Sequence, residues 1–215
     1  LAWTAAAAAA GFVAGYALLR ERVRKRSWVL SVLNGFAVTL LGCAALLDFA
    51  AAGLEPGAVS GSSVCADVCC VVFEVFLLLD LVVSQLEYPS EMSILSGWIH
   101  HTLYGAFVPF VLFHHNSNAL GVFMVEELPT AVLGLGHLGV YRTDLGFGFL
   151  FFAFRIAYHT FFTLTLWRLR HEGLGRYWAV AVATLLLHCH WFYLWCVGQA
   201  RRMGWLPEKK KARKG

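Results

Sequence analysis

Seven long apolar runs, separated by short polar stretches, constrain the fold of this chain more than any other feature of its sequence. An α-helix needs about 17–25 predominantly apolar residues to cross a bilayer, and every run is close to that length. Since 59% of the residues are hydrophobic and only 14% are charged, a water-soluble enzyme fold is excluded. The runs predict an all-α integral membrane protein with about seven transmembrane helices, at 2–19, 28–52, 64–83, 94–113, 119–140, 147–167 and 177–199.

Positive charge predicts how these helices are oriented. The formal net charge of +4 comes mostly from two basic clusters, Arg20 to Arg26 and Arg201 to Lys214. With seven spans both clusters lie on the same side, and lysine and arginine favour the cytosolic side of a membrane. One loop, 168–176, conflicts with this orientation, because three arginines there lie against one acidic residue, Glu172. The basic clusters therefore report membrane orientation, and no nucleic-acid partner is expected.

The few ionisable side chains inside the apolar runs say most about where a functional site lies. Each costs roughly 2.5–3.5 kcal/mol at a helix centre, so each needs a partner or a cavity. Helical depth places six of them in one slab between the cytosolic surface and the bilayer centre: Asp80, His100, His101, Glu127, Arg155 and His190. Glu126, His159 and His188 also lie within the apolar runs.

Helical geometry predicts which of these side chains share a cavity. Arg155 and His159 are four residues apart on one helical face, so both can point into the same cavity. His188 and His190 point roughly 200° apart, so at most one of them joins it.

Two groups of these residues have both a functional and a structural interpretation. We expect Arg155 to pair with Glu127 or Glu126, because a guanidinium beside a carboxylate removes two costly charges at once. The pair is either the polar end of a binding site or a structural ion pair that fixes the register of the bundle. Likewise, His100 and His101 either carry chemistry or bond only to the backbone or a neighbouring carboxylate.

Four polar motifs lie on successive apolar runs. They are Asp80 in LLLDLVV, His100 and His101 in WIHHTLYG, Glu126 to Thr130 as EELPT, and Arg155 in FRIAYHTFF. In this order and spacing they resemble the TLC domain family, which takes in ceramide synthases, translocation-associated membrane proteins and the smaller TLC-domain (TLCD) proteins. The resemblance implies an N-terminal helix and basic loop at 1–27, a TLC domain at 28–200 and a basic tail at 201–215.

The resemblance also implies a six-helix TLC bundle, preceded by one helix, around a cavity that opens to the cytosolic side and accommodates a lipid or an acyl chain. In ceramide synthases the adjacent histidines serve acyl transfer from acyl-CoA to a sphingoid amine, and they correspond here to His100 and His101. Ceramide synthases carry His-Asp and Ser-Asp elements further along the chain, where this sequence has EELPT. The chain therefore looks more like the TLCD branch, whose members are associated with membrane phospholipid composition.

We therefore expect a protein that holds an acyl chain or phospholipid inside the bundle, with Arg155 engaging a phosphate or carboxylate headgroup. The alternatives are a non-enzymatic accessory subunit of a membrane complex, and an acyltransferase with catalytic His100 and His101 and acyl-CoA as donor, so whether it is an enzyme stays open. Otherwise no cofactor and no metal are expected. The expected lipid-binding residues are Arg155, Glu127, His159, Asp80, Glu126 and His190.

Membrane lipids are the expected partners, with other membrane protein subunits under the accessory hypothesis. The endoplasmic reticulum is the expected membrane, and a mitochondrial or other organelle membrane is the alternative. A di-iron desaturase would need HxxxH and HxxHH boxes, which the nine histidines do not form. A retinal protein would need a lysine within a span for its Schiff base, and every lysine lies outside the spans.

Overall fold

Every secondary-structure element in the described part of the chain is helical. The computed structural model describes residues 1–53, 55–171 and 174–207, so Glu172 and the tail residues 208–215 lie outside it. The α-helices are α1 (Ala2–Leu19), α2 (Val29–Ala51), α3 (Val64–Glu87), α4 (His100–Phe113), α5 (Ser117–Gly121), α6 (Leu128–Leu138), α7 (Asp144–Phe151), α8 (His159–Arg168) and α9 (Tyr177–Arg202). Shorter helical segments are η1 (Arg26–Trp28), η2 (Pro56–Val59), η3 (Pro89–Glu91), η4 (Ile94–Ile99), η5 (Val122–Glu127) and η6 (Phe152–Tyr158).

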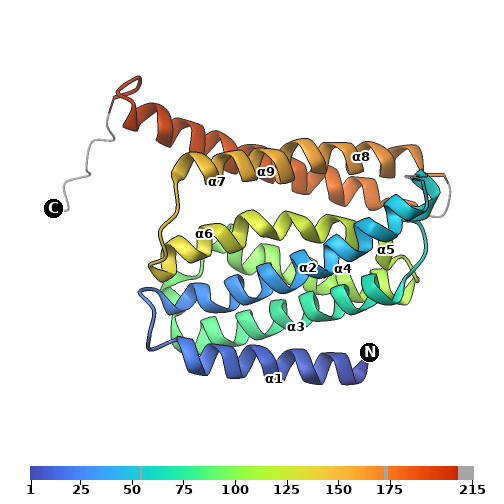
Figure 1. Ribbon diagram of the computed structural model, residues 1–215, viewed down its shortest axis with the longest axis horizontal. Helices are drawn as coiled ribbons and strands as arrows, with labels where there is room; N and C mark the ends of the chain where they lie inside the picture. The colour runs from blue at the N-terminus through green and yellow to red at the C-terminus, as the bar shows by residue number, and fades with distance from the viewer. Residues whose placement is uncertain (54, 172–173, 208–215) are drawn as a thin grey trace.

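Five helical stretches are long and apolar enough to cross a membrane. They are α1, η1 with α2, α5 to α6, α7 to α8, and α9. The two other predicted spans, 64–83 and 94–113, are helical as well, in α3 and in η4 followed by α4. Figure 1 shows the long helices side by side, with α7, α8 and α9 along one edge. The described part of the chain is therefore all-helical, as predicted, and its apolar helices fit a chain that lies in a membrane.

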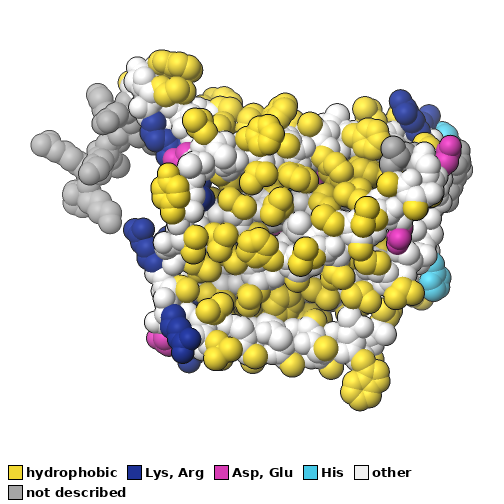
Figure 2. Space-filling model, in the orientation of Figure 1, with side chains coloured by type: hydrophobic (Ala, Val, Ile, Leu, Met, Phe, Trp, Pro, Cys, Tyr) yellow, Lys and Arg dark blue, Asp and Glu magenta, His cyan; other side chains and the backbone are white. Residues whose placement is uncertain are grey.

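The surface of the bundle has an apolar middle and polar ends. Figure 2 shows hydrophobic side chains spread over the middle of the visible face, with Lys and Arg at its two ends. Apolar side chains exposed over the length of several parallel helices are what a bilayer covers.

One end of the bundle, which we call the basic end, collects the connections that the sequence placed on one side. Arg20 and Arg26, in the connection from α1 to α2, both form ion pairs with the Glu87 carboxylate at the end of α3, at 2.9 and 3.1 Å. The backbone of the same connection donates a hydrogen bond to the last residue of α6. At the other edge Arg202 Nη1 lies 2.8 Å from Asp144 Oδ2, which joins the end of α9 to the start of α7.

The opposite end, which we call the far end, brings together the connections after α2, α4 and α8. Asn116 Oδ1 accepts a hydrogen bond from the Gly61 amide at 3.3 Å, and Asn116 Nδ2 donates to Tyr177 Oη at 3.4 Å. Arg170, whose guanidinium carbon lies 4.2 Å from the centroid of the Trp167 ring, follows α8 at this end. The arginines of the loop 168–176 thus remain opposite the basic end, as the sequence predicted.

Close packing holds α2 in the centre of the bundle. A Cβ added at Gly35 would come within 2.8 Å of Ala131 Cβ on α6, and one at Gly42 within 2.9 Å of the Val125 backbone nitrogen on η5. Real Cβ atoms do not approach so closely, so glycine allows α2 to contact the neighbouring span directly.

Three segments interrupt the regular α-helices that the sequence predicted. η5 is a 3₁₀ segment that ends with Glu126 and Glu127, and η6 is a π-helical segment that contains Arg155. η4 is also π-helical and directly precedes His100 and His101. Irregular turns of this kind are frequent at functional sites, and here all three adjoin the ionisable residues of the spans.

Candidate functional site

Arg155 lies buried in the bundle, where η6 presents its guanidinium to η5, α6 and α9. Nε donates a hydrogen bond to the Glu126 carbonyl at 2.9 Å. Nη2 donates both to the Glu127 carboxylate and to the Thr130 hydroxyl, each at 2.7 Å. Nη1 lies 2.9 Å from Nε2 of His188. Of the two acidic partners predicted for Arg155, Glu127 therefore forms the ion pair, and Glu126 contributes its backbone.

Glu126 and His159 form a second pair of acid and base beside the first. His159 Nδ1 lies 2.7 Å from Glu126 Oε2, and His159 Nε2 lies 2.8 Å from the Ala181 carbonyl oxygen. Since a carbonyl oxygen only accepts, Nε2 carries a hydrogen and donates it. The contact of Nδ1 with the carboxyl then requires one proton between the two groups. Whether this proton sits on the imidazole or on the carboxyl, the pair has no net charge.

His188 is the histidine of α9 that joins this cluster. Its Nε2 faces the guanidinium of Arg155, which has only donors, so Nε2 accepts. Its Nδ1 donates to the Arg155 carbonyl at 3.1 Å, and the ring is neutral. His190 is exposed, so of the two histidines only His188 joins the cluster. The reason is the turn of roughly 200° between the two positions, which allows only one of them to point inward.

The histidine pair and Asp80 lie nearer the basic end. His101 Nδ1 is 3.5 Å from Asp80 Oδ2, and Tyr88 Oη donates to Asp80 Oδ1 at 3.4 Å. Burial and the neighbouring Asp80 carboxyl raise the pKa of Tyr88, so the phenol stays protonated and keeps donating. His100 packs its ring on that of Tyr104, with 4.7 Å between centroids. The two adjacent histidines therefore have different surroundings: His101 lies beside the Asp80 carboxyl, and His100 lies against the Tyr104 ring.

A cavity of about 700 Å³ extends from the basic end into the bundle. Its volume lies within the range of about 300–1,000 Å³ that small-molecule sites occupy. Apolar side chains dominate its walls, among them Trp28, Phe76, Leu133, Phe151 and Trp191. The ionisable side chains Asp80, His100, His101, Glu127 and Arg155 also line it.

A second, smaller cavity of about 60 Å³ adjoins the first and extends toward Tyr177 at the far end. The two cavities share His100, Glu127 and Arg155, so they meet at one cluster of side chains. We call this cluster the polar layer, which comprises His100, Glu126, Glu127, Arg155, His159 and His188. Both Arg155 and His159 line the smaller cavity, which confirms the prediction that they face one cavity.

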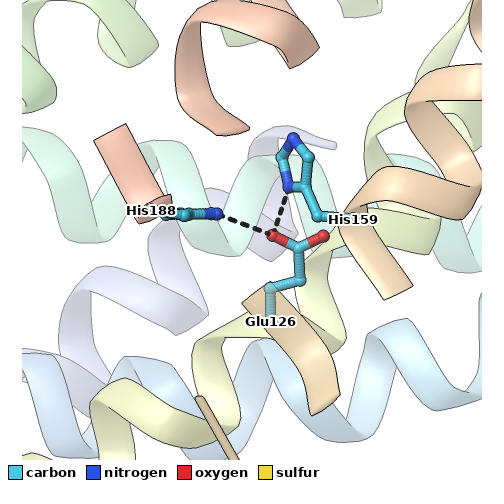
Figure 3. A group of neighbouring side chains, drawn as sticks. All are labelled: Glu126, His159 and His188. Carbon is cyan, nitrogen blue, oxygen red and sulfur yellow. Dashed lines mark hydrogen bonds and ion pairs between the residues drawn. The ribbon is translucent and has the colours of Figure 1, made fainter. Parts of the chain in front are cut away.

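Glu126, His159 and His188 also have the composition of a metal site. Figure 3 shows the three side chains pointing toward one another, and their candidate ligand atoms lie within 4.8 Å of each other. Two histidines and one glutamate hold zinc in some enzymes. Here, however, Arg155 engages both ring nitrogens of His188. A divalent cation would have to expel the proton shared by Glu126 and His159 and break a hydrogen bond of Arg155, so the geometry favours a protonated network.

Three residues of the site were given no role by the sequence analysis: Thr130, Tyr104 and Thr184. Thr130 was noted only as part of the EELPT motif, yet its hydroxyl accepts from Arg155. Tyr104 and Thr184 share a hydrogen bond of 2.7 Å between α4 and α9, and both line the smaller cavity. An uncharged hydroxyl costs little on an apolar helix, so these positions do not stand out in the sequence as the charged ones do.

Comparisons with known proteins add no identification. No family model matches this chain, and no curated protein and no solved structure matches it. The resemblance to the TLC domain family therefore stays a prediction, and the site must be interpreted from its geometry.

Proposed function

We propose that this protein is a multi-pass membrane protein of TLC type, with seven spans, that binds a lipid in the larger cavity. The lipid's polar group lies at the polar layer, and its acyl chain lies against the apolar walls. One observation carries the proposal: a cavity of about 700 Å³ with mostly apolar walls ends on a buried cluster of ionisable side chains. A large apolar pocket with a few convergent polar groups is the usual form of a ligand site.

The cost of the polar layer supports a role in binding. Glu126, Arg155, His159 and His188 are each at most 5% exposed, between helices that are apolar enough to lie in a membrane. Ionisable side chains at such positions are rare and usually mark the path or the site of a ligand. An ion pair with a purely structural role would need only one acid and one base. The polar layer has two acids and several bases, and it also borders a cavity.

Blocking the cavity tests the proposal. Leu133→Trp places an indole in the larger cavity. Leu186→Trp is the matched control, because Leu186 lies on α9 and is 67% exposed. Each protein is purified in mild detergent, and its retained lipids are extracted and quantified by mass spectrometry. We expect wild type and Leu186→Trp to retain a stoichiometric lipid and Leu133→Trp to lose it. Wild-type protein without lipid above the detergent background would contradict the proposal and favour the accessory-subunit hypothesis.

Acyl transfer is a second candidate, because His101 lies 3.5 Å from Asp80 at the wall of the same cavity. A carboxylate that orients an imidazole is a common arrangement for general base catalysis. Purified protein is offered labelled acyl-CoA with amine and lysolipid acceptors. Transfer that His101→Asn abolishes and that His190→Asn leaves intact would support this activity, and no transfer to any acceptor would count against it.

A further inference from the structure

Both carboxyl groups of the polar layer face a basic group. The pairs are Glu127 with Arg155 at 2.7 Å and Glu126 with His159 at 2.7 Å. Each pair combines one acid with one base and has no net charge. The charges of the polar layer are therefore balanced before any ligand arrives.

Arg155 has little left to offer an anionic ligand. A guanidinium has five N–H groups, and four of them already donate to the protein. A phosphate or carboxylate at this position would either compete with Glu127 for the guanidinium or add an uncompensated negative charge. Either change is costly at this depth in a membrane. This argues against the expectation that Arg155 engages a charged headgroup.

The groups that remain suit a neutral ligand. The Glu127 side chain is 17% exposed and lines both cavities, so it can accept a hydrogen bond from a hydroxyl or an amide. His100, another member of the polar layer, also lines both cavities. Neither contact requires the ligand to carry charge.

We infer that the lipid bound here presents an uncharged polar group to the polar layer, such as a glycerol ester, an amide or a long-chain alcohol, because each acid of the polar layer is already paired with a base. This inference rests on the lipid binding proposed above. It names the chemical class of the ligand, which lipid binding alone leaves open.

Monooleoylglycerol and its phosphate ester test the inference, because they differ only in one charged group. Binding to the purified protein is followed by displacement of a dansyl-labelled monoacylglycerol, using energy transfer from Trp28, Trp191 and Trp195 in the cavity wall. We expect wild type to bind the neutral lipid about tenfold tighter or more, since a buried charge without a partner costs at least that much. Glu127→Gln leaves Arg155 without its anion, so the preference should fall about tenfold or reverse.

Glu74→Gln is the matched control. This carboxyl lies on α3 and is not among the residues that line either cavity, so the preference should stay at the wild-type value. Tighter binding of the phosphate ester by wild type would overturn the inference while leaving lipid binding intact. An unchanged preference in a folded Glu127→Gln protein would overturn it as well. If neither lipid displaces the probe from wild type, the proposed function itself fails.

Discussion

Arg155 Nη2 and Glu127 Oε1 lie 2.7 Å apart although the two residues belong to different spans, 28 positions apart in the sequence. The contact joins η6 to the end of η5, where neither segment is a regular α-helix. It lies at the junction of the two cavities, so the same ion pair that joins two spans also faces the proposed lipid site. Substitutions of this pair therefore test both the stability of the bundle and the proposed binding.

Replacement of Arg155 should destabilise the protein strongly. Arg155→Met leaves the Glu127 carboxylate buried without its cation, which typically costs about 3–5 kcal/mol. Arg22→Met, at an exposed position of the basic end, should change stability by no more than about 0.5 kcal/mol. Thermal unfolding in detergent measures both. Equal melting temperatures for the two variants would show that the buried pair does not stabilise the bundle.

A double variant distinguishes the interaction between Arg155 and Glu127 from the separate effects of the two residues on stability. Arg155→Met combined with Glu127→Leu removes both charges, so it should recover a large part of the stability that Arg155→Met loses. Two additive losses would mean that the residues do not interact.

The two histidines of α9 should differ although they are two positions apart. His188→Phe removes two hydrogen bonds to Arg155 and should cost about 1–3 kcal/mol, because a buried carbonyl and a guanidinium N–H lose their partner. His190→Phe, on the exposed face, should be nearly neutral. Urea or thermal unfolding of the two variants checks this. A larger loss for His190→Phe would contradict the inward position of His188.

The sequence predicted a large part of this arrangement, because charge in an apolar run is a strong signal. An arginine, two glutamates and several histidines inside spans had to find partners, and helical geometry limited Arg155 to a few of them. Geometry alone could not choose between His188 and His190, since either could face inward. That choice depends on how α9 packs against α7 and η6, which involves residues distant in the sequence.

The irregular segments were not predictable in the same way. A 3₁₀ or π-helical turn keeps the apolar composition of the run, so η5 and η6 look like parts of ordinary spans in the sequence. Pro129 gave only a weak hint, because a proline in the first turn of a helix is also common in regular helices. The cavities depend on how side chains from many helices fill space, and no motif encodes that.

Because α2 lies in close contact with η5, substitution of Gly42 should destabilise the protein far more than substitution of Gly11. Gly42→Ala forces a methyl group against the η5 backbone and should cost about 1–3 kcal/mol through overpacking. Gly11→Ala on α1 meets nothing within 4 Å and should be neutral, or stabilise by up to about 1 kcal/mol through helix propensity. Unfolding in detergent distinguishes them. A neutral Gly42→Ala would contradict the tight contact between α2 and η5.

Labelling of single cysteines checks the two ends of the bundle. In a background without the six native cysteines, Tyr141→Cys lies at the basic end and His114→Cys at the far end, both exposed. A membrane-impermeant maleimide should label the first from one side of a sealed membrane and the second only from the other. From the positive-inside rule we expect the basic end to be the cytosolic one. Labelling of both positions from the same side would refute the membrane arrangement.

A density map of the protein in lipid nanodiscs tests the central claim most directly, because it observes the larger cavity itself. The account predicts an elongated density between Trp28 and Trp191 that reaches Arg155 and His101. It further predicts the Arg155–Glu127 ion pair intact beside that density. A cavity closed by its own side chains, with no lipid between these residues, would contradict it.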